Sequence, residues 1–211
     1  MPGQALRSPR VGVICGMIGA AFVALACLAM SGCATVIYPP PAPTVPVKIA
    51  VLDHGRHASL VVEIPGEPAM IRYSYGDWDW YALGQTGPIE ATNAIFWPSQ
   101  AALGRRELPG PPSADSLFRG LSVAVEDMLF IEVSSASARD LIARLDGIYA
   151  SNVATRLYNA SYDLEFVHHP DGYWAFHNSN QMVREWLIIL GCLVEGPAIL
   201  SDWRLAAPAA K

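Results

Sequence analysis

The chain contains 211 residues, with 14 Lys and Arg against 19 Asp and Glu, which gives a formal net charge of −5 at pH 7. This acidity argues against a nucleic-acid-binding protein, because phosphate recognition needs clustered Lys and Arg. About 165 residues follow the N-terminal and proline-rich segments, a normal size for one domain with a substantial core.

Residues 1–32 differ in kind from the rest of the chain. They carry Arg7 and Arg10 but no acidic residue, and residues 11–30 form a run of 20 uncharged residues. As a helix, such a run would reach about 30 Å, the thickness of the hydrocarbon core of a bilayer. The pattern predicts a membrane-targeting segment, either a cleaved signal peptide or an uncleaved anchor helix.

The end of this segment, Met30-Ser31-Gly32-Cys33, resembles the lipobox of bacterial lipoproteins. That resemblance implies a signal peptide over 1–32 and a lipid anchor on Cys33, so that the protein faces the periplasm. In lipoproteins of Gram-negative bacteria, a residue other than Asp after the lipidated cysteine implies export to the outer membrane, and Ala34 stands here. Beyond Cys33 only Cys192 remains, which excludes an internal disulfide and a zinc site built on cysteines.

Residues 33–46 are rich in proline, which removes backbone donors and favours an extended chain. The prolines are Pro39, Pro40, Pro41, Pro43 and Pro46. We expect a lipidated proline-rich tether over 33–46, a folded domain over 47–205 and a disordered tail over 206–211.

The first part of the domain reads as strands. Residues 47–52 and 59–64 alternate in the manner of a hairpin around the polar turn 53–57, and residues 70–75 predict a third strand. Residues 77–106 indicate only short helical and looped pieces. Residues 128–133 predict a fourth strand.

The second part mixes helices and strands. A capping-box-like start at Ser137 and Asp140 predicts a helix over 137–151. Two short aromatic strands, 164–168 and 173–176, follow around a turn at 170–172, and Asn178 is expected to cap a helix over 180–190 that Gly191 ends. This order predicts an α+β domain, an antiparallel sheet packed by helices.

His57 and Ser179 are the candidates for catalysis. Ser179 lies in the first turn of a predicted helix, where free N–H groups and the helix dipole favour developing negative charge on a nucleophile or an oxyanion. Imidazole titrates near neutral pH and can accept a hydroxyl proton, so His57 could serve as the base if the first hairpin lies beside that helix. The simpler alternative is that His57 and Ser179 only cap a turn and a helix.

Four ordered blocks resemble a bacterial domain-of-unknown-function family, numbered 2459, over most of residues 47–205. The blocks are His54-Gly55-Arg56-His57-Ala58-Ser59-Leu60-Val61, Tyr73-Ser74-Tyr75-Gly76-Asp77-Trp78-Asp79-Trp80-Tyr81, Phe96-Trp97-Pro98-Ser99 and Asn178-Ser179-Asn180. Family members read Gly-Trp-His-Thr, Phe-Gly-Trp-Gly-Asp and Asn-Thr-Cys-Asn at three of these places. Here Ser179 replaces the cysteine, and Met182 and Arg56 stand where tryptophans are expected.

The family resembles circularly permuted papain-like folds, in which a histidine precedes a cysteine nucleophile that starts a helix packed on an antiparallel sheet. This resemblance implies that His57 is the general base and that Ser179 takes the place of the nucleophile. A serine hydroxyl ionises far less readily than a thiol, so the exchange is not equivalent.

Other polar residues complete the candidate site. Asp77 and Asp79 alternate with Trp78 and Trp80, and this segment either lines a groove in which Asp77 orients His57, or packs its tryptophans in the core beneath an acidic turn. Tyr75, Asn178 and Asn180 are further candidate cleft residues. Glu165 and His177 are alternative third members of a catalytic set.

A metal site is not expected. The five histidines are His54, His57, His168, His169 and His177. Gly55 argues against a helix that would align His54 with His57, and adjacent His168 and His169 on a strand would point to opposite faces.

The sequence therefore predicts a periplasm-facing lipoprotein with an amidase-like or acyltransferase-like domain and no cofactor. Its expected partners are the membrane, through the lipid anchor, and a cell-wall peptide or lipid ligand. The rival prediction is a catalytically degenerate binding or scaffold lipoprotein of the envelope.

Overall fold

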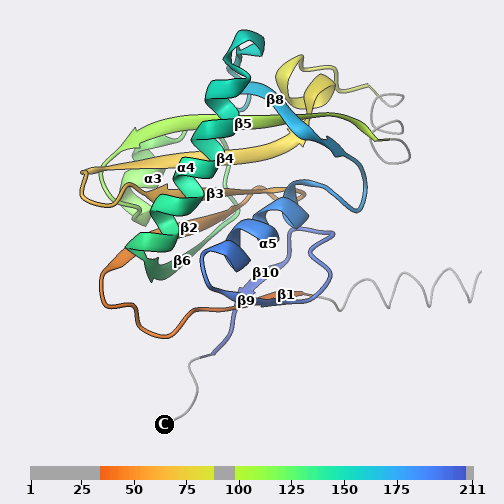
Figure 1. Cartoon of the computed structure of the whole chain (residues 1–211). Coiled ribbons are helices and arrows are strands. Elements are labelled where there is room, and N and C mark those ends of the chain that lie inside the picture. Colours follow the sequence, from red (N-terminus) through yellow and green to blue (C-terminus); the bar gives the residue numbers. More distant parts are fainter. Residues whose placement is uncertain (1–33, 88–97, 208–211) are drawn as a thin grey trace, which may run out of the picture. The chain divides into compact units, whose positions relative to one another are not determined.

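The computed structural model describes residues 34–87 and 98–207 (Figure 1). The predicted signal peptide, Cys33, Phe96, Trp97 and the end of the predicted tail, 208–211, lie outside the described residues. Among the described helices, none has the length and apolar character needed to cross a bilayer.

Seven strands form one antiparallel sheet, in the order β6-β2-β3-β4-β5-β8-β7. The strands are β2 (Pro46–Asp53), β3 (Ala58–Glu63), β4 (Ala69–Asp77), β5 (Ser99–Pro109), β6 (Asp127–Ser134), β7 (Leu157–Asn159) and β8 (Leu164–Tyr173). Side chains alternate between the two faces of a strand. In β2, Ile49 and Val51 accordingly join the core on one face, while Ala50 and Leu52 join a second cluster on the other.

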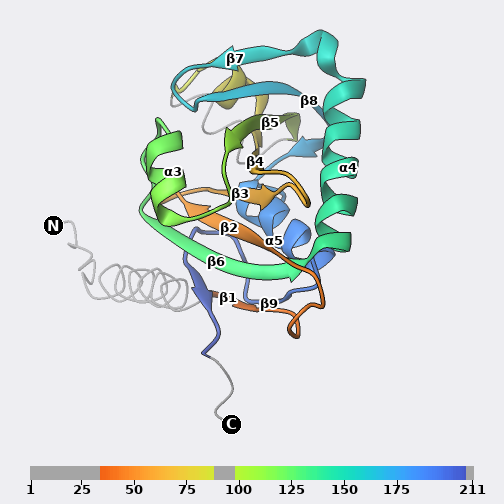
Figure 2. The same cartoon turned by 90° about the vertical axis from the view of Figure 1, so that its left-hand side faces the viewer.

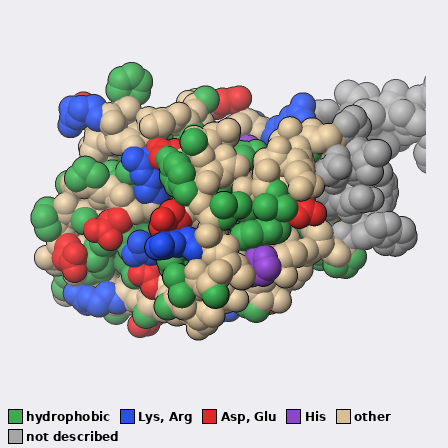
Figure 3. Space-filling model, turned by 90° about the horizontal axis from the view of Figure 1, so that it is seen from above, with side chains coloured by type: hydrophobic (Ala, Val, Ile, Leu, Met, Phe, Trp, Pro, Cys, Tyr) green, Lys and Arg blue, Asp and Glu red, His purple; other side chains and the backbone are tan. Residues whose placement is uncertain are grey.

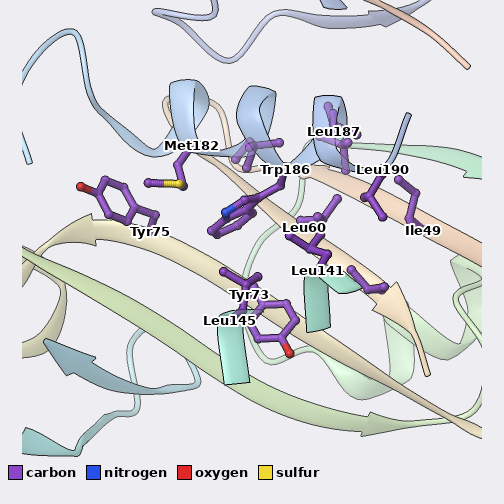
Figure 4. Close-up of a cluster of buried hydrophobic side chains, with 14 of the residues drawn as sticks. Ile49, Leu60, Tyr73, Tyr75, Leu141, Leu145, Met182, Trp186, Leu187 and Leu190 are labelled. Atoms are coloured by element: carbon purple, nitrogen blue, oxygen red, sulfur yellow. The ribbon is translucent and has the colours of Figure 1, made fainter. Parts of the chain in front are cut away.

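Two helices, α4 (Ser135–Ser151) and α5 (Ser179–Ile189), cover one face of the sheet (Figures 1 and 2). Figure 4 shows α5 directing Met182, Trp186 and Leu187 toward the side chains of the sheet. Both helices are capped by side chains, because Ser134 accepts a hydrogen bond from the Ser137 amide and Asn178 caps α5. The two predicted helices are therefore present, with starts one or two residues earlier than expected.

The other face carries shorter elements. Helix α3 (Ala114–Gly120) packs Leu117 against β2 and β3, and a 3-10 turn, η2 (Val153–Thr155), follows α4. A single π-helical turn, η1 (Trp78–Ala82), packs Tyr81 and Ala82 against β5 and β8. The predicted α+β class, an antiparallel sheet packed by helices, is confirmed.

Two strand predictions were wrong. The region 77–106 contains most of β5, a central strand whose small residues Ala101, Ala102 and Gly104 hide the usual pattern. The two predicted aromatic strands are one strand, β8, which runs through Pro170 because the ladder with β5 bulges between Gln100 and Ala102. At a bulge, the residue of the neighbouring strand need not donate a backbone N–H hydrogen bond to the ladder, so proline is tolerated at that position.

Part of the predicted tether is folded. Strand β1 (Thr35–Tyr38) pairs with β9 (Leu193–Glu195) and β10 (Trp203–Leu205) in a second, three-stranded sheet. Thr35 and Ile37 are buried in it. The prolines begin only at Pro39, so the expected tether over 33–46 is wrong for 35–38, and the folded unit begins at Ala34 rather than at residue 47.

The surface carries charges of both signs. In the described part of the face shown in Figure 3, acidic and basic side chains intermingle, with hydrophobic side chains grouped beside them. This part of the face has no basic patch of the kind that phosphate recognition needs.

Candidate functional site

His57 ends the tight turn between β2 and β3, as the sequence predicted. Gly55 adopts a φ of +89°, and its amide donates to Asp53 Oδ1 at 2.7 Å. The His54 amide donates to the His57 carbonyl at 3.0 Å. This left-handed backbone favours glycine, so the turn depends on Gly55 to bring His57 to the start of β3.

His54 lies beside His57 and packs against its ring. The two rings stack with centroids 5.3 Å apart. His54 Nδ1 lies 2.7 Å from the Ala124 carbonyl, which can only accept, so Nδ1 carries the proton and Nε2 accepts from Ser59 Oγ at 2.9 Å. Sequence reasoning considered His54 only as a metal ligand and missed this packing role.

A buried arginine stands behind this histidine pair. Arg72 is 3% exposed, and its guanidinium donates to Ser59 Oγ at 3.1 Å and to the Tyr162 carbonyl at 3.0 Å. It lies 3.4 Å from His54 Nε2. A charged residue in the apolar run 70–75 was the sequence signal that could have identified it.

The environment keeps His57 neutral. Burial, and to a smaller extent the charge of Arg72, lower the pKa of His57 to about 4, with Asp53 opposing part of the shift. Burial and Arg72 likewise lower the pKa of His54 to about 3. At neutral pH, His57 is therefore an unprotonated imidazole, which can accept a proton but is a weaker base than a free histidine.

Ser179 is the first residue of α5 and is 2% exposed. The Asn178 side chain accepts from the amides of Asn180, at 2.9 Å, and Gln181, at 3.1 Å. Two of the expected oxyanion donors are thus engaged. Among the described residues the Ser179 amide has no acceptor, which leaves it as the first-turn N–H able to bind an oxyanion.

Asn180 connects the two halves of the site. It is 1% exposed, and its Nδ2 donates to the carbonyl of Arg56 at 3.1 Å and to that of Ile199 at 3.3 Å. Arg56 precedes His57, so this bond ties the start of α5 to the histidine turn. Asn180 therefore supports the site from behind instead of lining it as predicted.

Most of the predicted site residues line one cavity of about 870 Å³. Those that line it are His57, Asp77, Trp80, Asn178 and Ser179. Three tyrosines, Tyr81, Tyr162 and Tyr173, and the apolar residues Ala175, Ile199 and Leu200 complete its walls, together with four other residues. Sequence reasoning missed these walls. Within the described chain, no hydrogen bond joins the His57 ring to the Ser179 hydroxyl, although both face one space.

Asp77 was predicted to orient His57, but its carboxylate makes no hydrogen bond to that histidine. Its carboxylate accepts from the Trp80 amide at 2.8 Å and from Ser99 Oγ, so it caps η1. It is 5% exposed, which also rules out the alternative of a solvated acid at this position. Asp53, in the histidine turn itself, is the carboxylate whose charge acts on His57.

Tyr75 and Trp78 do not line the cavity. Tyr75 is buried, and its hydroxyl donates to the Gly172 carbonyl at 2.9 Å. Trp78 packs on His168, with ring centroids 4.3 Å apart, as the core-packing alternative predicted.

The alternative third members are also engaged elsewhere. Glu165 accepts from the Tyr149 hydroxyl at 2.8 Å, and His177 Nδ1 lies 2.8 Å from the Gly172 carbonyl. Neither lines the cavity. In the described residues, no group of three or more His, Cys, Asp and Glu could hold a metal ion.

Asn180→Ala is expected to lower the free energy of unfolding by about 2 kcal/mol, because each lost hydrogen bond contributes roughly 1 kcal/mol and two carbonyls lose a partner. Urea unfolding measures this. Gln181, the next residue in the chain, provides the matched control. Gln181→Ala removes an exposed hydrogen bond to the Pro197 carbonyl and should cost less than about 0.5 kcal/mol. Equal losses would contradict the bracing role of Asn180.

Comparison with protein-family models, with curated proteins and with solved structures found no match to this chain.

Proposed function

We propose that this protein is a lipoprotein of the cell envelope. Its domain hydrolyses peptide or acyl amides, or transfers their acyl group to an acceptor. Ser179 is the nucleophile and His57 the general base. The observation that carries the proposal is that an unprotonated imidazole and a hydroxyl at the start of a helix line one cavity. The proposal includes a permuted papain-like arrangement, in which the histidine hairpin precedes the helix of the nucleophile.

The envelope location rests on the N-terminal sequence. Arg7 and Arg10, the uncharged run 11–30 and the residues before Cys33 support a signal peptide and a lipid on Cys33. The domain would then face the periplasm, anchored to the outer membrane.

The chemistry follows from the groups in the cavity. His57 accepts the hydroxyl proton as Ser179 Oγ bonds to the carbonyl carbon, and the Ser179 amide donates to the oxyanion. The C–N bond then breaks, and His57 returns its proton to the leaving amine. Water, or an acceptor amine or hydroxyl, finally attacks the carbonyl carbon of the acyl-serine while His57 accepts its proton. The bond from that carbon to Ser179 Oγ then breaks, and His57 returns the proton to Ser179 Oγ.

The cavity fits a sizeable substrate. At about 870 Å³ it lies within the range of ligand pockets, and aromatic walls with a few polar groups are typical of such sites. A cell-wall peptide or a lipid acyl chain satisfies both the size and the lining.

Reaction with a fluorophosphonate probe tests the proposal. The natural protein should be labelled, and Ser179→Ala should abolish labelling because the attacking oxygen is gone. His57→Gln should slow labelling by about 100-fold or more, the usual contribution of a general base. Ser151→Ala, at an exposed serine that ends α4, is the control and should label normally. Labelling that persists in Ser179→Ala would overturn the assignment.

The second candidate is a binding or scaffold lipoprotein that retains the cavity without the chemistry. The unformed bond between His57 and Ser179 and the engagement of two helix amides by Asn178 favour it. A binder should ignore the fluorophosphonate but gain thermal stability from stem-peptide fragments of the cell wall or from a fatty acyl amide.

A further inference from the structure

A cluster of exposed apolar side chains lies beside the cavity. Trp174 is 40% exposed and Phe176 is 62% exposed, and their rings meet edge to face with centroids 5.3 Å apart. Leu200 is 57% exposed and lines the cavity, as does Ala175 between the two aromatics. We call Trp174, Phe176 and Leu200 the apolar rim. Aromatic side chains grouped in this way at the surface mark contact sites more often than isolated exposed residues do.

Hydrogen bonds hold the two segments of the apolar rim together. Asn178 Nδ2 donates to the Ala175 carbonyl at 3.0 Å and to the Ile199 carbonyl at 3.2 Å. The connection from β8 to α5 and the segment before β10 therefore lie side by side. The apolar rim is a built feature of the fold and is not a collection of loose loop ends.

The polypeptide enters the domain next to the same segment. The Thr35 amide donates to the Asp202 carbonyl at 2.8 Å, and the Ala198 amide donates to Thr35 Oγ1 at 3.0 Å. Gly196 lies so close to Ala34 that a Cβ on it would stand 2.6 Å from the Ala34 carbonyl oxygen. Figure 1 shows the start of β1 and the β8–α5 connection on one side of the domain.

The described domain begins at Ala34, directly before the buried Thr35. The proposed lipid on Cys33 would therefore be joined to the domain with no linker between them. Anchored in this way, the chain would hold the segment 196–202, which carries Leu200, close to the membrane.

We propose that the apolar rim docks on the phospholipid bilayer in which the chain is anchored, so that the cavity opens toward the lipid interface. The inference rests on the membrane anchor of the proposed function but not on its chemistry. Trp and Phe are well suited to the boundary between headgroups and acyl chains. Because the anchor keeps the rim at high effective concentration near the surface, three apolar side chains suffice for docking.

Quenching by lipids measures the docking. The full chain is reconstituted in vesicles of phosphatidylethanolamine and phosphatidylglycerol that contain nitroxide-bearing lipid. An environment-sensitive fluorophore is attached in Phe176→Cys, in Leu200→Cys and in the control Phe118→Cys, and the natural chain gives the background. Phe118 is 82% exposed but lies on α3, which packs against the other face of the sheet. Quenching at positions 176 and 200 should exceed that at 118 by about twofold or more, because only the rim enters the interface.

Equal quenching at the three positions, or none at 176 and 200, would overturn the docking. A second variant separates docking from chemistry. Trp174→Ser combined with Phe176→Ser should lower quenching at position 200 to the level at 118 and leave labelling by a dissolved fluorophosphonate unchanged. Absent labelling with intact quenching rejects only the proposed chemistry, whereas unchanged quenching in this double variant rejects only the docking.

Discussion

Acidification from pH 7 to pH 4 is expected to reduce the free energy of unfolding by roughly 5 kcal/mol, because one unit of pKa shift corresponds to about 1.4 kcal/mol. The cause is the pair of partly buried histidines. The pKa of His57 is lowered to about 4 and that of His54 to about 3, from an ordinary value of 6.5. As the pH falls, both histidines are therefore protonated in the unfolded chain before they are protonated in the folded protein.

The sign of the effect follows from proton binding. Between pH 6.5 and pH 4 the unfolded chain binds more protons than the folded one, so stability falls as the pH falls. The contribution of the two neutral histidines to the free energy of unfolding is fully present above pH 6.5. It is lost progressively as the pH falls toward their pKa values in the folded protein. Burial lowers the pKa of His169 as well, which acts in the same direction.

His57→Gln provides the control for this measurement. Urea unfolding at a series of pH values should show a shallower slope in the variant, by about 1.4 kcal/mol per pH unit, because one of the titrating groups is gone. A natural protein whose stability does not change between pH 7 and pH 5 would show that the histidines titrate normally. In that case Arg72 and burial do not act on His57 as described.

Gly76→Ala is expected to destabilise the protein by about 3 kcal/mol, at the upper end for an overpacked core. A Cβ at this position of β4 would stand 2.2 Å from the ring of Tyr81. The ring has little room to move, because Tyr81 is buried and packs on Tyr162, with ring centroids 4.7 Å apart. It also meets His57 edge to face, so the substitution should disturb the candidate site together with the core.

Gly147→Ala is the matched control for this prediction. Gly147 lies in α4 with no atom near the position of a Cβ, so the same added methyl group should stabilise the helix by up to about 1 kcal/mol. The two variants are expected to shift the urea midpoint in opposite directions. Tyr81→Ala combined with Gly76→Ala should cost less than the sum of the single changes, since both act on one contact. Additive losses would mean that the Tyr81 ring is not what Gly76 accommodates.

The sequence alone determined the features that depend on neighbouring residues. The alternation in 47–52 and 59–64 identified a hairpin around Gly55, and Asn178 marked the start of α5. The start of α4 was predicted two residues late, because its N-cap is Ser134 and not the capping box expected at Ser137 and Asp140. These signals are local, because a turn, a cap or an alternating strand is set by residues within a few positions of one another. The same local reasoning identified His57 and Ser179, which both line the cavity.

Only the tertiary structure decided which distant segments meet. The Asp77 carboxylate pairs with Ser99 instead of His57, and the Phe166 ring of β8 occupies the space that the missing side chain of Gly104 leaves in the central strand β5. Strand β1 folds because β9 and β10, more than 150 residues away, accept it as a partner. Such contacts bring together residues far apart in the chain, and neither spacing nor propensity encodes which pairs will form.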